Sequence, residues 1–546
     1  MDQSVLSPAA SANIAKEVAK RRTFAIISHP DAGKTTLTEK LLLFGGAIQA
    51  AGTVKARKSG KFATSDWMAI EKERGISVAS SVMQFEYRDC VMNLLDTPGH
   101  RDFSEDTYRV LTAVDAALMV IDGTKGVEAQ TIKLLEVCRN RGTPIVTFIN
   151  KLDREGRHPL ELIDEIEDIL KIHCAPITWP VGMGKRFAGV YDLINDRTLL
   201  YAAAEDRDQR AVEAVPGLDH PRVAERYAAE VADAREEVGL IRSDVREFDR
   251  EHFLEGELTP VFFGSAMNNF GVDQVLDMLV AEAPPPTVRA AVQREVRADE
   301  PKFSAFVFKI QANMDPQHRD RIAFLRICSG RFERGMRLFH TRTGKEIRAS
   351  QVVAFLSQRR EIVEDAWPGD IIGLLNHGSI DIGDTFTEGE KLTFTGIPFF
   401  APEMFRMVEI ANPIKAKQLL KGLQQLGEEG AIQVFRPLVG NDIILGAVGQ
   451  LQFEVTAHRL QAEYGVDARL RAASFYGARW ISSDSPRKLA EFESHLAAQL
   501  ARDASGSLTF LATSKPNLDL TQERWPDIKF HALREHALSF ADVGGR

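Results

Sequence analysis

The sequence predicts a multidomain α/β protein: a P-loop α/β domain, then a β-barrel domain, then an α+β, ferredoxin-like C-terminal domain. The stretch SHPDAGKTTL (residues 28–37) lies between an apolar run and a helical pattern. Short alternating strands split by glycines follow the stiff linker EAPPPTV at 282–288, and from about residue 393 helices alternate with strands. These changes of pattern predict domains at 20–285, 300–392 and 393–546.

The stretch 28–37 departs in one place from the phosphate-loop pattern G-x-x-x-x-G-K-[ST], because Ser28 replaces the first glycine. That position needs a small side chain, so serine fits wherever φ is negative. Backbone N–H groups and the helix N-terminus would bind the β-phosphate. Lys34 would reach the β- and γ-phosphates, and the Thr35 hydroxyl would bind Mg²⁺. The predicted phosphate-binding residues of this loop are Ser28, His29, Pro30, Asp31, Ala32, Gly33, Lys34 and Thr35.

A second motif, NLLDTPGH (93–100), ends an apolar strand. An aspartate at the strand end can hold Mg²⁺ through water, and a glycine N–H can sense the γ-phosphate because its backbone approaches closely. His100 is the catalytic candidate, since hydrolysis needs an attacking water held in line. The alternative is a histidine that only caps the following helix. The phosphate-binding residues predicted here are Asp96, Thr97, Pro98 and Gly99.

Two further strand ends, FINKLD (148–153) and VFFGSAMN (261–268), predict the choice of base. The carboxylate of Asp153 can accept hydrogen bonds from N1–H and the exocyclic amine of guanine, a donor pair that adenine lacks. Because ligands of open α/β sheets bind at the carboxyl ends of strands, the four motifs predict one GTP site and a P-loop GTPase domain. The predicted guanine-binding residues are Asn150, Lys151, Asp153, Ser265 and Ala266.

The charged stretch EKERGISVASS (71–81) lies between the first two motifs. Its residues 74–77 would close over GTP, and loss of the γ-phosphate would release them. The alternative is an ordinary charged surface loop. Ser77 could place a second hydroxyl on Mg²⁺, so the predicted metal ligands are Thr35, Ser77 and Asp96.

The composition limits the class of protein. The net charge is −9, which argues against general nucleic-acid binding through a basic face but leaves docking to a ribonucleoprotein through local patches open. No run approaches the roughly 18 apolar residues of a membrane span, and no apolar signal core opens the chain. The four cysteines show no C-x-x-C spacing. We therefore expect a cytoplasmic protein without a membrane anchor.

The remaining segments carry no predicted chemistry. PLELIDEIEDIL (159–170) has helical periodicity, and an insert is expected at about 175–255, with charged, solvated helices over 204–214 and 222–238. In the last domain, the pattern predicts a helix capped by Ser485, with Leu489, Phe492, Leu496 and Leu500 facing inward. The sequence shows no internal repeat.

The motifs DAGKTT, ERGIS, DTPGH, NKLD and GSA resemble, in order, the markers of the translation-factor GTPases. The resemblance implies that His100 orients the hydrolytic water on the ribosome and that the barrel contacts the small ribosomal subunit. It also implies that Thr35 and Ser77 bind Mg²⁺, with Ser77 standing where most of the family has threonine.

Residues 28–82 and the stretch ATSKPNLDLTQERWPDIKF look most like family members that act in termination. This implies a monomeric, ribosome-activated GTPase that promotes dissociation of class I release factors after the peptide is freed. The implied partners are GTP and GDP, ribosomal RNA and proteins, and class I release factors.

Two other functions stay open at this point. One is a different translational GTPase, such as a translocase-like or ribosome-protection factor, against which the chain length and the serines at 28 and 77 argue. The other is a GTP-binding scaffold that switches shape without useful turnover, against which Lys34, Thr35 and His100 argue.

Overall fold

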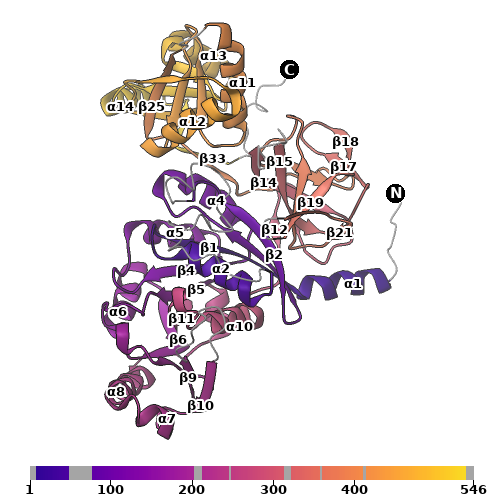
Figure 1. Ribbon diagram of the computed structural model, residues 1–546. Coiled ribbons are helices and arrows are strands. Elements are labelled where there is room, and N and C mark those ends of the chain that lie inside the picture. The colour runs from indigo at the N-terminus through magenta and orange to yellow at the C-terminus, as the bar shows by residue number, and fades with distance from the viewer. Residues whose placement is uncertain are drawn as a thin grey trace.

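The computed structural model describes residues 8–47, 77–201, 212–244, 247–312, 321–356, 359–409 and 413–535. Figure 1 shows the α/β domain at the centre, with the β-barrel beside it and the C-terminal α+β domain above it. Helix α1 (Pro8–Ala19) projects from the α/β domain past the barrel. Within the described ranges, none of the helices has both the length and the apolar character needed to cross a bilayer.

The α/β domain is built on a seven-stranded sheet with the order β2-β3-β1-β4-β5-β11-β6. Strand β2 runs antiparallel to β3, and all the other pairs are parallel. Strands β4, β5 and β11 are buried along their whole length, as expected for parallel strands covered on both faces. The strands are β1 (Arg21–Ser28), β2 (Ser81–Tyr87), β3 (Cys90–Asp96), β4 (Ala116–Asp122), β5 (Ile145–Asn150), β6 (His173–Pro176) and β11 (Leu258–Phe263).

Helices cover both faces of this sheet. One face carries α2 (Lys34–Phe44) and α10 (Val272–Glu282), and the other carries α4 (Ser104–Thr112), α5 (Ala129–Asn140) and α6 (Pro159–Leu170). Alternate strand residues point to opposite faces, so each strand feeds two separate apolar cores. The bounds of α6 are those that the apolar periodicity predicts.

A second, four-stranded antiparallel sheet with the order β10-β9-β8-β7 lies at the far end of the α/β domain from the C-terminal domain (Figure 1). Helix α8 packs against β7 through buried Val231 and Val238, so the charged pattern of this helix covers only its outer face. The elements are β7 (Thr178–Val181), β8 (Gly189–Asp192), β9 (Arg197–Tyr201), β10 (Val212–Pro216), α7 (Pro221–Ala224), α8 (Ala228–Asp244) and α9 (Arg250–Leu254).

The solvated helix expected over 204–214 is wrong for residues 212–214. These residues belong to β10 and pair with β9, because alternate positions meet cross-strand partners there rather than a helical face. Residues 204–211 lie outside the described residues.

The middle domain is an antiparallel sheet with the order β18-β17-β23-β14-β15-β22-β19-β20. Its long central strands, β14 and β15, are buried throughout, and phenylalanines such as Phe306, Phe324 and Phe386 fill the interior. The strands are β14 (Ser304–Ala312), β15 (Arg321–Ser329), β17 (Arg337–His340), β18 (Lys345–Arg348), β19 (Val352–Leu356), β20 (Arg359–Ile362), β22 (Ile371–Leu375) and β23 (Thr385–Thr387), with the short pairs β12 (Arg289–Ala290)/β13 (Glu295–Val296) and β16 (Phe332–Glu333)/β21 (Asp365–Ala366).

The C-terminal domain has one eight-stranded sheet with the order β28-β25-β27-β26-β30-β31-β29-β32. Each half has the chain order βαββαβ and the same ferredoxin-like strand order, and the halves join where β26 pairs with β30. The elements are β25 (Met404–Glu409), α11 (Ala416–Glu428), β26 (Gln433–Pro437), β27 (Ile444–Ala447), α12 (Gln450–Tyr464), β28 (Arg469–Ala472), β29 (Gly477–Ser482), α13 (Pro486–His495), β30 (Leu500–Arg502), β31 (Leu508–Ala512), α14 (Lys515–Arg524) and β32 (Lys529–His531).

The structure corrects two expectations for this domain. The chain contains an internal structural repeat, although the sequence shows none. Helix α13 is capped by Ser485 as predicted, but it ends at His495, and Leu500 opens β30. Leu500 is fully buried all the same, because β30 pairs with β31 at the junction of the two halves.

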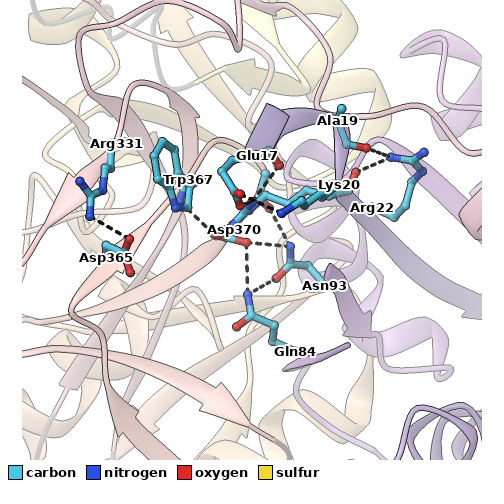
Figure 2. Close-up of polar contacts among 12 residues, drawn as sticks. Glu17, Ala19, Lys20, Arg22, Gln84, Asn93, Arg331, Asp365, Trp367 and Asp370 are labelled. Carbon is cyan, nitrogen blue, oxygen red and sulfur yellow. Dashed lines mark hydrogen bonds and ion pairs between the residues drawn. The ribbon is translucent and has the colours of Figure 1, made fainter. Parts of the chain in front are cut away.

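A buried polar network joins the α/β domain to the barrel (Figure 2). The Asp370 carboxylate, in the turn before β22, accepts from Arg21 Nε at 2.9 Å and from the side-chain amides of Gln84 and Asn93 at 3.2 Å each. The backbone N–H of Trp367 donates to the same carboxylate at 2.9 Å. Four donors from both domains therefore converge on one buried charge.

Candidate nucleotide-binding and catalytic site

Four loops meet at the carboxyl edge of the seven-stranded sheet. They follow β1, β3, β5 and β11, and the parallel pairing of these strands brings their ends to the same side. All four predicted motifs lie in these loops. The structure thus places side by side residues that are more than 200 positions apart in the chain.

The phosphate loop begins as the sequence predicts. Ser28 is the last residue of β1, so it is extended, and its hydroxyl donates to the His29 carbonyl at 2.8 Å. The loop then turns through Asp31 (φ 65°) and Gly33 (φ 98°), and α2 begins at Lys34. A Cβ at position 33 would overlap the side-chain amide of Asn150. Serine is therefore compatible with the first position, whereas glycine is needed at 33.

The loop after β3 packs against the phosphate loop. A Cβ on Gly99 would lie 3.5 Å from the His29 carbonyl and from the backbone of Pro30. The hydroxyl of Thr97 donates to the carbonyl of Ile26 in β1 at 2.7 Å. His29 itself is buried beside Glu128, and burial lowers its pKa below the ordinary value for histidine.

Lys34 and Asp96 form the charged centre of the site. Lys34 Nζ donates to Asp96 Oδ1 at 2.5 Å, and both side chains are buried. The second oxygen of Asp96, Oδ2, is also buried, and it has no hydrogen-bond partner among the residues that the structure describes. A buried carboxylate oxygen without a partner fits a divalent cation, because Mg²⁺ prefers oxygen ligands.

The other two predicted metal ligands lie in α2 and in the segment before β2. Thr35 is the second residue of α2. Ser77 precedes β2, whose Ser81 pairs with Asp96 in register. Residues 74–76 of the predicted switch segment lie outside the described residues.

The predicted guanine pocket is held together by hydrogen bonds between three loops. Asn150 donates to the carbonyl of Ala32 at 2.8 Å and accepts from the N–H of Ala266 at 2.9 Å. The hydroxyl of Ser265 donates to Asp153 Oδ1 at 2.6 Å. Lys151 Nζ donates to the carbonyl of Asp31. Asn150 and Lys151 thereby connect the predicted base-binding and phosphate-binding residues.

Asp122 is a site residue that the sequence analysis missed. It ends β4 and accepts from Lys151 Nζ at 2.7 Å. Burial raises its pKa, but the hydrogen bonds from Lys151 and Thr124 outweigh burial and hold the pKa below the ordinary value. The signal was an aspartate closing the apolar run AALMVID, the same pattern that singled out Asp96.

His100 lies at the start of a short 3₁₀ helix, Arg101–Phe103, and is partly exposed. Its Nδ1 accepts from the N–H of Asp102 at 3.2 Å, so the ring has the capping contact that the sequence left open as an alternative. A ring nitrogen that accepts is unprotonated, so the neutral ring carries its proton on Nε2. The cap thus leaves His100 with an N–H donor for a ligand.

Comparison with known proteins gives three family matches along the chain. Residues 19–285 match the elongation factor Tu GTP binding domain, residues 302–389 match elongation factor G domain 2, and residues 394–522 match the C-terminal domain of class II release factor RF3. These matches confirm the predicted order of an α/β GTPase domain, a β-barrel domain and an α+β domain.

Curated relatives align over almost the whole chain. Peptide chain release factor 3 of Bordetella pertussis is 63% identical over 525 residues, which cover 96% of this chain and 98% of the relative. The protein of the same name from Nitrosomonas europaea is 62% identical and covers 97% and 99%. The chain belongs to the peptide chain release factor 3 family.

A similar fold is also found in a solved structure with lower sequence identity. A crystal structure of a protein from Thermus thermophilus superposes with a TM-score of 0.68 at 25% identity, covering 85% of this chain and 69% of that one. The arrangement of domains therefore persists where the sequences have diverged.

Proposed function

We propose that the chain is a ribosome-dependent GTPase of translation termination, which hydrolyses GTP to GDP and phosphate. The observation that supports this most is the 63% sequence identity, over almost the whole chain, to peptide chain release factor 3 of B. pertussis. The geometry agrees, since loops matching all four GTPase motifs meet at one edge of the sheet. The alternative of a translocase-like or ribosome-protection factor is not favoured, because the C-terminal domain matches that of RF3.

In the proposed complex, each loop contacts one part of GTP. The N–H groups of residues 31–35 and of Gly99 surround the phosphates, and Lys34 turns from Asp96 toward the β- and γ-phosphates. Asp153 pairs with N1–H and the exocyclic amine of guanine, while Ser265 holds its carboxylate. Asn150 and Ala266 close the pocket.

The buried oxygen of Asp96 and the hydroxyls of Thr35 and Ser77 form the proposed Mg²⁺ site. When bound, Mg²⁺ would supply positive charge that offsets the negative charge developing on the phosphates during hydrolysis. The ion pair with Lys34 uses only Oδ1 of Asp96, so the buried Oδ2 is left for Mg²⁺.

His100 is the proposed catalytic residue. Its Nε2–H, opposite the capped Nδ1, can donate to the attacking water or to the developing phosphate charge once the ring is brought to the phosphates. Since the histidine caps a short helix in this structure, we propose that the ribosome moves the ring and this helix together into place. A low intrinsic rate and strong stimulation follow from that requirement.

We further propose that hydrolysis is coupled to departure of class I release factors after peptide release. The chain would act as a cytoplasmic monomer whose partners are GTP or GDP, the ribosome and the class I factor. Both the class I factor and the monomeric state are inferences from the family.

GTP turnover on defined ribosomes tests the proposal. We expect the purified chain to hydrolyse GTP slowly alone and about 100-fold or more faster with ribosomes that hold a class I factor at a stop codon. His100→Ala should lose most of this stimulation while it keeps its affinity for GTP. Absence of stimulation would contradict the proposed function, whereas an unchanged rate for His100→Ala would remove only the role of the histidine.

A further inference from the structure

Helix α12 of the C-terminal domain packs on the two segments that flank the γ-phosphate side of the site. Val455 of α12 forms a buried apolar cluster with Val78 and Phe103, and Leu451 packs against the same cluster. Val78 follows the proposed Mg²⁺ ligand Ser77, and Phe103 is three residues beyond His100. A single helix of another domain therefore touches both segments that would respond to GTP.

Asp102 links this helix to the catalytic candidate. Its Oδ2 accepts from the N–H of Leu451, in the first turn of α12, at 2.7 Å. Its Oδ1 lies 3.5 Å from Nδ1 of His100. The two oxygens of one carboxylate thus face two different domains, and the positive end of the α12 dipole favours the negative charge between them.

The N-cap of α12 is shaped to admit this carboxylate. Gly449 has φ −150° and ψ 170°, an extended conformation that any residue adopts, so backbone strain does not require glycine here. A Cβ at this position would instead overlap the carboxylate of Asp102. What glycine provides is space for the close approach of the two domains.

We propose that Asp102 is a positioning residue for His100, and that docking of α12 holds Asp102 in place. The inference rests on the catalytic role proposed above for His100. The N–H of Asp102 fixes the ring by donating to Nδ1, which leaves Nε2–H as the donor, and the carboxylate anchored at Leu451 holds that N–H in place. Because α12 fixes that carboxylate, the C-terminal domain controls how well His100 performs its task.

Two variants on opposite sides of the interface test the proposal in the full-length chain. Asp102→Ala removes the carboxylate, and Gly449→Ala displaces it without altering the α/β domain. Each should lower kcat of ribosome-stimulated GTP hydrolysis about tenfold while the KM for ribosomes and the affinity for GTP stay unchanged. Gly477→Ala is the matched control, since a Cβ there meets only ordinary contacts, and it should match the wild type.

Double variants show whether the effect passes through His100. Asp102→Ala should cost nothing further in a His100→Ala background, and Gly449→Ala should cost nothing further in an Asp102→Ala background. Asp102→Asn, which keeps an oxygen for the Leu451 N–H, should recover part of the rate. Additive losses, or an unchanged kcat in Gly449→Ala, would overturn the proposal.

The control on His100 separates this inference from the proposed function. If His100→Ala hydrolyses GTP at the wild-type rate on ribosomes, the histidine has no role and Asp102 has nothing to position. If His100→Ala is slow but both Asp102→Ala and Gly449→Ala are normal, the catalytic role stands and the inference about α12 is overturned.

Discussion

At the scale of single residues, Asp153 is the proposed determinant of which base the site accepts. Ser265 holds one oxygen of this carboxylate at 2.6 Å, so its orientation is set before a ligand arrives. Asp153→Asn replaces an acceptor with an amide donor, which pairs with the 2-oxo group of xanthine instead of the guanine amine. We expect GTP affinity to fall about 100-fold and XTP affinity to rise, as measured by nucleotide titration.

The opposite outcome for Asp153→Asn would contradict the proposed contact with guanine. Retention of tight GTP binding would show that the base lies elsewhere. Asp164→Asn, a change on the outer part of α6, is the control and should bind GTP as the wild type does.

The unpaired oxygen of Asp96 leads to a prediction about metal dependence. Removal of Mg²⁺ by EDTA should weaken GTP binding by the wild type, because the phosphates lose a cation and the buried Oδ2 of Asp96 loses its partner. Asp96→Asn should bind more weakly at the outset and respond less to EDTA, in paired titrations with and without chelator. Equal responses of the two proteins would place the cation away from Asp96.

At the scale of elements, the barrel contains a buried carboxylate whose protonation should lower the free energy of unfolding. Asp384 is fully buried and accepts from Arg342 Nε at 2.6 Å and lies 2.8 Å from His340 Nε2. Burial raises its pKa, but Arg342 and His340 outweigh burial and lower the pKa to about 2.

A lowered pKa in the folded state means stability that is present above about pH 4 and lost as the pH falls toward 2. Between pH 5 and pH 3, the free energy of unfolding of the wild type should therefore fall by about 1 kcal/mol more than that of Asp384→Asn. Urea unfolding at these two pH values measures the difference. Parallel losses in both proteins would show that Asp384 does not contribute.

Most elements could be predicted from local pattern, because periodicity reports which face of a segment is buried. Helix α6 follows from apolar residues at 3.6-residue spacing, and Ser485 followed by Pro486 marks the start of α13. The end of α13 could not be predicted, since Leu500 continues the apolar stripe but is buried by strand pairing. The two βαββαβ halves share topology rather than sequence, so the repeat was invisible before the strand order was known.

At the scale of the whole molecule, Asp370 is the residue at the centre of the buried network between the α/β domain and the barrel. Asp370→Ala would remove the buried partner of Arg21 Nε, leaving Glu17 as the acidic partner of this arginine, and would take an acceptor from Gln84 and Asn93 (Figure 2). Breaking a buried pair in this way should cost about 3 kcal/mol in the free energy of unfolding, measured by urea denaturation.

A matched control for this interface lies five residues away. Asp365 pairs with Arg331 at 3.0 Å, but both side chains are more than 40% exposed, so Asp365→Ala should change stability by less than about 1 kcal/mol. Equal effects of Asp365→Ala and Asp370→Ala would contradict the view that the buried network holds the barrel to the α/β domain.

Contacts between domains are the part of the structure that the sequence could not predict. The four loop motifs can be recognised in the sequence because each one follows an apolar strand. The parallel sheet then brings the loops together. Asp102 and Leu451 are separated by 349 positions, and nothing local in either segment signals the partner. The same holds for Arg21 and Asp370.

The most direct test of the proposed function follows the departure of the class I release factor itself. A fluorescent class I factor on a ribosome at a stop codon, after peptide release, should leave several-fold faster when the chain and GTP are added, and His100→Ala should slow this turnover. Rapid GTP hydrolysis with an unchanged departure rate would contradict a role in releasing the class I factor, because the energy of GTP would then serve a different step on the ribosome.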